Sequence, residues 1–271
     1  MYKYINLGKE IPPLPTFNLL LGIGMIAFFL SLERVFRRNA ISFQIADEIK
    51  KIAFYAATFG VLGAVVGESI FQRNGIDLRF SGFTFYGGFF GAISSLWLIS
   101  LVKNLNFFYL SNIMIAPLVI GHAFGRIGCF LGGCCFGRPT KSIFGVIYPS
   151  GSLPNEQFGS QALYPIQLIE SVFLFILFII LTRIKLKWKF ASYLVIYPIL
   201  RFLIEFYRGD NRGMLTIDII SPSQEISLVL LLSGIMIFYK ELTFDNIKPY
   251  IQKPLQAKDM KIKNTYKRLT K

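Results

Sequence analysis

Long uninterrupted runs of apolar residues dominate this sequence. Seven of them stand out, at residues 14–32, 52–70, 84–102, 110–125, 165–182, 190–207 and 224–239. Most are long enough for a helix, which rises about 1.5 Å per residue, to cross the roughly 30 Å hydrocarbon core of a bilayer. The fourth run is short and contains Pro117, so we expect that helix to kink or to lean on its neighbours. The pattern predicts an all-α integral membrane protein with seven transmembrane helices.

The basic residues between these runs predict how the chain is oriented. Lysine and arginine fall mainly in the connections after the first, third and fifth runs and in the segment after the last run. Positively charged loops stay on the cytoplasmic side of a membrane. The N-terminus is therefore predicted outside and the C-terminus inside, with a membrane domain over residues 1–240 and a basic cytoplasmic tail over residues 241–271. We expect the first run to be a retained helix rather than a signal peptide, because charged residues follow it directly and it has no small-residue cleavage site.

Composition agrees with a membrane protein. Of the 271 residues, 54% are hydrophobic and 16% are charged, whereas a soluble domain carries about 25% charged residues. The formal net charge of +14 invites a nucleic-acid interpretation. The basic residues, however, lie mostly in short loops and in the tail, which is the pattern of orientation by charge. We therefore expect membrane lipids as partners and no nucleic acid.

The sequence contains three cysteines, Cys129, Cys134 and Cys135, and one histidine, His122. An odd count with such tight spacing is not typical of a disulfide framework. The histidine with the three cysteines could ligate zinc, but two of the cysteines are adjacent and paired ligands at metal-site spacing are missing. We interpret the cysteines as small residues packed at a helix end, and predict neither a metal nor a cofactor.

With the orientation assigned, unusual polar residues fall at the outer ends of five helices. These are Glu68, Tyr86, His122, Arg126, Gln167, Glu170, Arg201, Glu205 and Arg208. The inner halves hold nothing comparable, so a polar path to both faces, as a transporter needs, is not indicated. Ionisable groups inside a membrane are expensive and usually face a bundle interior or a cavity. The clustering predicts a site that faces the outer leaflet.

Arg201 is the most informative of these residues because it lies near the middle of its run, where an arginine costs about 2.5–3.5 kcal/mol on insertion scales. Tyr197 lies one helical turn before it, Glu205 one turn after it, and Arg208 follows, so the four form one polar stripe. A buried ion pair that only joins helices would explain the stripe. The clustering of histidine, tyrosine and a second arginine at the same depth favours a binding site instead.

Residues 122–139 read HAFGRIGCFLGGCCFGRP and contain five glycines. Glycine at this density lets the backbone approach a ligand and leaves amide groups free to bind an anion. Arg126 and Arg138 add guanidinium groups, which suit phosphate better than an ammonium does. Together with the stripe, this segment predicts a site for the head group of an outer-leaflet phospholipid.

Over about residues 12–240 the sequence resembles the prolipoprotein diacylglyceryl transferase family. The signature of that family, a Gly-Arg-x-Gly run followed by Phe and a Gly-rich stretch, is matched by GRIGCFLGGCCFGRP at 125–139. Three further blocks agree in order: SGFTFYGGFFGA at 81–92, YPIQLIES at 164–171 and YPILRFLIEFYRGD at 197–210. The resemblance also implies seven helices, with the N-terminus outside and the C-terminus inside a bacterial plasma (inner) membrane.

The resemblance implies a transferase that moves the diacylglyceryl group of phosphatidylglycerol onto the lipobox cysteine thiol of a prolipoprotein. Glycerol phosphate leaves and a thioether forms, so the phosphate charge must be stabilised and the thiol deprotonated. Arg126 and Arg201 match family arginines and suit the phosphate, while Glu205 matches a family glutamate; all three are expected to be catalytic. The residues expected to bind substrate are Tyr197, Gly137, Arg138, Gln167, Arg208 and Cys129.

Three positions depart from the family pattern. Tyr86 stands where the family usually has histidine, Cys129 where it has asparagine, and Cys134 where it has glutamate. The missing histidine is often given the role of base, so we expect His122, one turn before Arg126, to help deprotonate the thiol, with Tyr86 as the competing candidate. Two alternatives stay open: the same lipid donor with a different acceptor, and a non-catalytic phospholipid-binding or transport protein.

Overall fold

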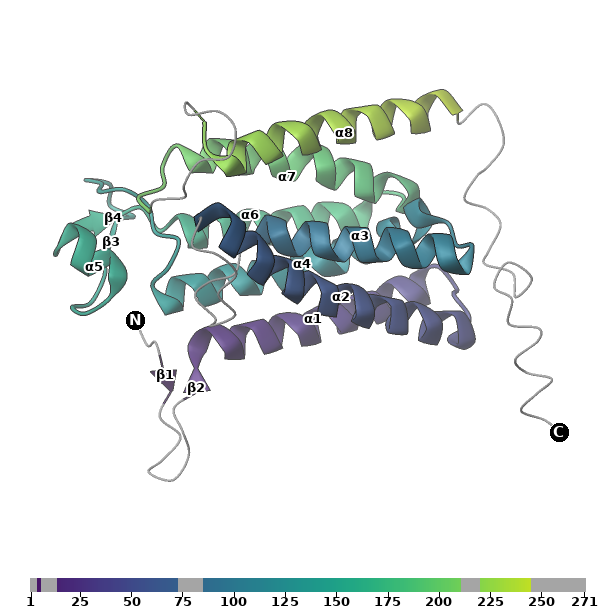
Figure 1. Cartoon of the computed structure of the whole chain (residues 1–271), viewed down its shortest axis with the longest axis horizontal. Coiled ribbons are helices and arrows are strands. Elements are labelled where there is room, and N and C mark those ends of the chain that lie inside the picture. Colours follow the sequence, from purple (N-terminus) through teal and green to yellow (C-terminus); the bar gives the residue numbers. More distant parts are fainter. Residues whose placement is uncertain (1–3, 6–13, 73–84, 211–219, 245–271) are drawn as a thin grey trace.

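Seven long helices form a bundle in the computed structural model, which describes residues 4–5, 14–72, 85–210 and 220–244 (Figure 1). They are α1 (Thr16–Arg38), α2 (Phe43–Gln72), α3 (Phe85–Lys103), α4 (Phe107–Gly132), α6 (Ile166–Arg183), α7 (Lys189–Glu205) and α8 (Pro222–Phe244). Each predicted apolar run coincides with one of these helices. The pattern of apolar residues therefore located every long helix within the described part of the chain.

Among the described residues, six of these helices are long and apolar enough to cross a membrane: α1, α2, α3, α4, α6 and α8. Many large apolar side chains on their outer surfaces are exposed, including Leu30 (67%), Trp97 (51%) and Met236 (71%). Such a surface suits lipid rather than water. The six apolar helices and the exposed apolar surface therefore confirm the prediction of an all-α integral membrane protein. The seventh helix, α7, has 17 residues and carries Arg201 and Glu205 within it.

The fourth helix differs from its prediction. Instead of a short element, α4 has 26 residues and continues through Gly132, well past the apolar run. It begins where the side chain of Asn106 accepts a hydrogen bond from the backbone N–H of Tyr109, and it ends at Gly133, whose left-handed conformation (φ 74°) stops the helix. The glycine-rich stretch stays helical because it packs closely on α1: a Cβ at Gly128 would lie 3.1 Å from the ring of Phe17. The signature segment is therefore mostly helix rather than loop.

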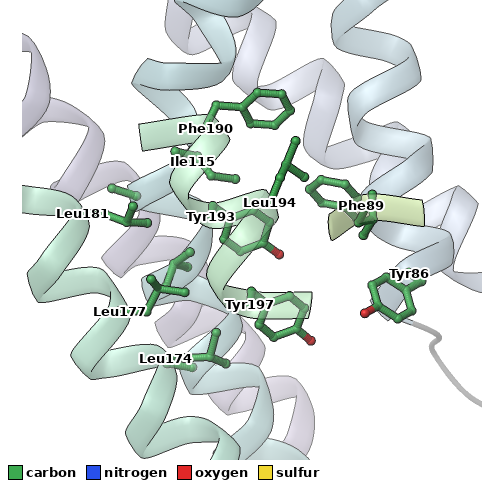
Figure 2. Packing of buried hydrophobic residues seen from close by; sticks show 14 residues of the cluster. Tyr86, Phe89, Ile115, Leu174, Leu177, Leu181, Phe190, Tyr193, Leu194 and Tyr197 are labelled. Carbon is green, nitrogen blue, oxygen red and sulfur yellow. The ribbon is translucent and has the colours of Figure 1, made fainter. Parts of the chain in front are cut away.

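Helix α4 occupies the middle of the bundle and contacts α1, α3, α6 and α7 (Figure 1). Its buried residues join a core that also draws on α3, α6, α7 and α8. In this core Tyr193 and Tyr197 stack in parallel with ring centroids 5.4 Å apart. The hydroxyl groups of Tyr86 and Tyr197 point toward one another at the end of the cluster (Figure 2). A hydrophobic core thus holds these two tyrosines near each other.

Helices α2 and α3 pack in very close contact. Gly63 of α2 faces Gly87 and Gly91 of α3 so tightly that a Cβ on Gly63 would lie 2.5 Å from the Gly87 carbonyl oxygen and 2.9 Å from the Gly91 Cα atom. Only glycine permits such an approach of two helix backbones. The contact sets the position of α3 and therefore of Tyr86 at its first turn.

A small subdomain lies beyond one end of the bundle, at the left in Figure 1. It consists of β3 (Val146–Ile147) paired antiparallel with β4 (Ala162–Leu163) and the short helix α5 (Leu153–Phe158). Phe136, Tyr148 and Leu163 form its core. Near the N-terminus, β1 (Tyr4–Ile5) pairs with β2 (Leu14–Pro15), and a 3-10 turn, η1 (Leu186–Trp188), joins α6 to α7. The subdomain connects α4 to α6 and therefore lies at the end where α4 stops and α6 starts.

The tail predicted over residues 241–271 begins within a helix. Helix α8 continues to Phe244, so the first residues assigned to a basic tail over 241–271 are helical. The rest of that tail lies outside the described residues.

The α2–α3 contact generates a first prediction. Gly63→Ala should lower the midpoint of thermal unfolding in detergent, because overpacking of this kind typically costs about 1–3 kcal/mol. The matched control is Gly22→Ala, since a Cβ at Gly22 meets no atom within 4 Å. Equal midpoints for the two variants would show that the backbone contact between α2 and α3 does not limit stability.

Candidate functional site

A cavity of about 330 Å³ opens among α1, α2, α3 and α4. Apolar side chains and glycines form most of its wall, including Leu21, Phe28 and Leu96. At one end the lining becomes polar, with His122, Arg126, Cys129, Cys135, Arg201 and Ser223. The cavity can therefore hold an apolar chain with an anionic group at its polar end.

Glu170, in the first turns of α6, joins the polar residues of three helices. Its carboxylate lies 3.0 Å from Nη2 of Arg126 and accepts a 2.9 Å hydrogen bond from the hydroxyl of Tyr197. Nε2 of His122 lies 3.9 Å away from the same oxygen. The side chains of Glu170 and Arg126 are 2% and 8% exposed. A buried pair of this kind is stable only because each charge compensates the other.

His122 is held by rings rather than by hydrogen bonds. Its imidazole stacks on Phe85 with centroids 3.6 Å apart and planes 5° from parallel, and meets the ring of Tyr197 edge-on at 5.4 Å. Among the described residues, neither ring nitrogen has a hydrogen-bond partner. The residue also lines the cavity, although both ring nitrogens are buried.

The stripe predicted along α7 is present and buried. Nη1 of Arg201 lies 2.5 Å from the Glu205 carboxylate, and Nη2 donates to Oγ of Ser223 at 3.0 Å. Arg208 lies just past the end of α7, where it donates two hydrogen bonds to the Asp210 carboxylate (2.9 and 2.6 Å) and stays 3.9 Å from Glu205. The stripe is thus a chain of alternating charges that continues beyond the helix.

Tyr86 acts as a hydrogen-bond donor in this arrangement. Its hydroxyl lies 2.7 Å from Oγ of Ser227 in α8. The Ser227 hydroxyl donates its own hydrogen to the backbone carbonyl of Ser223 at 2.6 Å, so the hydrogen between Ser227 and Tyr86 must come from the tyrosine. This bond leaves the Tyr86 oxygen poorly placed to take a proton from a substrate.

The end of the signature segment is joined by backbone contacts to the chain that follows α7. Gly137 forms a β-bridge with Arg208, and the backbone N–H of Arg138 donates to the Tyr207 carbonyl at 2.9 Å. A Cβ at Gly137 would lie 2.5 Å from the Tyr164 carbonyl oxygen, so this position requires glycine. The side chain of Arg138 is exposed, and Nε donates to the Arg208 carbonyl at 3.5 Å. Gly137 therefore positions the segment, whereas Arg138 faces outward.

Gln167, predicted to bind substrate, uses its side-chain amide within the protein. Its amide nitrogen donates to the Cys134 carbonyl at 2.7 Å, and its amide oxygen accepts from the Tyr148 hydroxyl at 3.3 Å. Burial raises the pKa of Tyr148 to about 12, so this hydroxyl remains a donor at neutral pH. Gln167 is 1% exposed and does not line the cavity. In this arrangement it anchors the subdomain to α6.

The three cysteines come together despite their sequence spacing. Their sulfur atoms all lie within 4.8 Å of one another, and Cys129 and Cys135 line the polar end of the cavity. Hydrogen bonding with Cys129 and Cys135, together with burial, raises the pKa of the Cys134 thiol above its ordinary value. The three cysteines therefore form a cluster that their sequence spacing did not predict.

The structure adds residues that sequence reasoning did not select for the site. Glu170 was recognised as a polar residue at a helix end but was given no role, although its position inside an apolar run was a usable signal. Ser223 and Ser227, which contact Arg201 and Tyr86, carried no such signal because serine is common in membrane helices. The side chain of Glu68 lies outside the described residues.

Comparison with known proteins gives a consistent result. A protein-family model described as "Prolipoprotein diacylglyceryl transferase" matches residues 9–240. A "Phosphatidylglycerol--prolipoprotein diacylglyceryl transferase 2" from Clostridium perfringens is 32% identical over 237 residues, 82% of this chain and 89% of the relative. A "Phosphatidylglycerol--prolipoprotein diacylglyceryl transferase" from Clostridium tetani is 29% identical over 238 residues, which cover 82% of this chain and 91% of the relative. A protein of the same name from Staphylococcus aureus strain bovine RF122 is 28% identical over 263 residues, which cover 90% of this chain and 92% of the relative.

The ion pair at the centre of the site generates a second prediction. Glu170→Gln should destabilise the fold by about 3–5 kcal/mol, because it leaves the buried Arg126 guanidinium without a negative partner. The thermal midpoint in detergent measures this, with Glu156→Gln on the exposed face of α5 as the control. Indistinguishable midpoints would mean that water or another group already compensates Arg126.

Proposed function

Because this chain belongs to the prolipoprotein diacylglyceryl transferase family, we propose that its cavity is where a diacylglyceryl group passes from phosphatidylglycerol to the cysteine thiol of a prolipoprotein. The observation that carries the assignment to this cavity is its division into an apolar wall and a polar end with two arginines. The wall suits acyl chains and the arginines suit the phosphate. A non-catalytic phospholipid-binding protein is not favoured by the relatives, which are transferases by name.

In the proposed reaction, the acceptor thiolate attacks the glyceryl carbon that carries the phosphate ester. The carbon–oxygen bond breaks, glycerol phosphate leaves with the bonding electrons, and the proton of the thiol goes to a base. Charge therefore develops on the phosphate and is removed from the sulfur, which is where the protein must act.

Arg126 and Arg201 are the proposed phosphate ligands. Nε of Arg126 is buried and has no hydrogen-bond partner among the described residues, although Nη2 of the same group is held by Glu170. Arg201 is fixed by Glu205 and Ser223 while it lines the cavity. Carboxylates thus hold both guanidinium groups in place without using all their donors, and a phosphate can bind the remaining ones.

His122 is the proposed base. It lines the cavity, its ring nitrogens have no hydrogen-bond partner among the described residues, and Glu170 lies 3.9 Å away, close enough to stabilise an imidazolium. Tyr86 is the weaker candidate because its hydroxyl donates to Ser227. We assign Tyr86 to positioning at the α3–α8 contact.

The remaining site residues have supporting roles in this proposal. Tyr197 orients Glu170, and Gly137 and Gln167 hold the signature segment against the chain around it. Arg208, which is compensated by Asp210 and Glu205, places a third guanidinium group toward the end of the bundle. Cys129 lines the cavity together with Arg126, whereas the exposed Arg138 does not line it and is proposed to contact the substrate outside it.

We further propose that α7 spans the bilayer with the other six helices, and that the cavity faces the outer leaflet of a bacterial plasma membrane. The basic residues support this orientation. Arg183 ends α6 on the side away from Glu170, and Lys185 and Lys187 lie between α6 and α7. Positively charged connections stay in the cytoplasm. The N-terminus is then outside, and residues 241–271 are the cytoplasmic tail of a domain over 1–240.

The direct test incubates purified full-length protein with phosphatidylglycerol labelled in its acyl chains and a lipobox peptide. The expected product is a thioether-linked diacylglyceryl peptide together with free glycerol phosphate. The control is the same peptide with serine in place of cysteine, which should stay unlabelled. Release of glycerol phosphate without labelled peptide would point to a different acceptor, and no release at all would contradict the proposed function.

Lysine substitutions test the role of the arginines. Arg126→Lys and Arg201→Lys should each lower turnover by roughly tenfold or more, because lysine is a point charge without the planar fork that binds phosphate in two places. Arg183→Lys, at the far end of α6, is the matched control. Normal turnover in both site variants would show that positive charge alone is sufficient.

Substitution of His122 tests the base. An ordinary thiol, with pKa about 8.5, is mostly protonated near pH 7, and a positioned base typically contributes about 10²–10⁴-fold. His122→Gln should therefore lower turnover at least tenfold at pH 7, and the deficit should shrink as the pH rises, because solution hydroxide then supplies the thiolate. Full activity of His122→Gln beside an inactive Tyr86→Phe would transfer the role to Tyr86.

A further inference from the structure

The reaction proposed above uses neither Cys134 nor Cys135, yet both belong to the cluster of three sulfur atoms at the polar end of the cavity. The sequence argued against a joint site because two of the cysteines are adjacent. The backbone removes that objection. Gly133 (φ 74°) and Cys135 (φ 58°) both adopt the left-handed conformation, and the backbone N–H of Cys134 donates to the Cys129 carbonyl at 3.1 Å. This turn folds the chain back on the end of α4 and brings all three sulfurs together.

We propose that Cys129, Cys134 and Cys135 bind one thiophilic divalent cation of the zinc class, and that a fourth coordination position faces the cavity. Tetrahedral zinc with bonds of about 2.3 Å to sulfur places its ligand sulfurs about 3.8 Å apart. The three sulfurs already lie within 4.8 Å of one another, so small side-chain adjustments complete three sides of such a site. Soft thiolates select this class of ion over magnesium or calcium.

Electrostatics favour the loaded site. Three thiolates around a divalent cation carry a net charge of −1. Arg126 interacts electrostatically with Cys129 and Cys135, and Arg208 interacts with Cys135, so two guanidinium groups stabilise that charge. Because the ion binds thiolates rather than thiols, binding must release protons.

The open position follows from where the sulfurs lie. Cys129 and Cys135 line the cavity, whereas Cys134 does not. The three sulfurs would therefore bind the ion from the cavity wall. Its fourth coordination position would face the cavity that His122 and Arg126 also line. A sulfur ligand that enters this space can complete the tetrahedron.

The experiment is a titration of reduced, purified full-length protein with Co²⁺, whose thiolate complexes absorb in the near-ultraviolet and visible range. One equivalent should bind, with proton release and an absorption band that Zn²⁺ abolishes by displacement. Cys134→Ser and Cys135→Ser should each weaken binding at least tenfold. The matched control is Ser111→Ala, which removes a hydroxyl from the same cavity wall and should leave binding unchanged.

Absence of the band, or equal binding in the cysteine variants and the wild-type protein, would overturn the site, provided that the thermal midpoints show the variants to be folded. A small thiol added to the Co²⁺-loaded protein should intensify the band, because a fourth sulfur enters; an unchanged spectrum would overturn the open position. The transferase assay on the same preparations separates the two proposals. If a preparation turns over substrate but shows no Co²⁺ binding in the titration, the metal site alone is overturned. If it binds Co²⁺ but shows no turnover, the proposed function alone is overturned.

Discussion

The buried carboxylate of Glu170 is the interaction on which the rest of the site depends. It compensates Arg126 from α4, accepts a hydrogen bond from Tyr197 of α7 and lies beside His122. An arginine buried inside a membrane protein without such a partner would be strongly destabilising. Because one carboxylate serves residues from two other helices, the relative positions of α4, α6 and α7 are set where the proposed chemistry takes place.

Charge compensation also explains how so many arginines can be buried together. Arg126 pairs with Glu170, Arg201 with Glu205, and Arg208 with Asp210. The three pairs are close to neutral as a group, which limits the free-energy cost of removing these charges from water when no anion is bound. Nε of Arg126 is buried and has no hydrogen-bond partner among the described residues. The guanidinium groups that we propose as phosphate ligands are thus already oriented, which would lower the reorganisation that binding or catalysis requires.

Glycine contacts give this polar cluster its geometry. Gly63 and Gly87 let α2 and α3 touch, which places Tyr86, and Gly137 lets the signature segment touch the chain at Tyr164 and Tyr207. The glycines of the signature were expected to bind an anion through free amide groups, but the backbone N–H of Gly137 donates to the Tyr164 carbonyl. At this position glycine serves packing, and the guanidinium groups are the anion ligands that we propose instead.

The sequence alone determined where the seven long helices lie, which ends of those helices carry polar groups, and the resemblance that names the family. These properties follow from the nearby sequence. A long apolar run predicts a membrane helix, and a buried arginine such as Arg201 requires a compensating group, although the sequence does not say which group that is. Only the tertiary structure decided which partner each group has. In the structure Glu170 pairs with Arg126 at the centre of the site. Gln167 forms hydrogen bonds with Cys134 and Tyr148, and Tyr86 donates to Ser227. The tertiary structure also brought Cys129, Cys134 and Cys135 together through a left-handed turn. Contacts of this kind depend on how each helix is rotated about its axis and on how the helices pack together. The spacing of residues along a single helix encodes neither the rotation nor the packing.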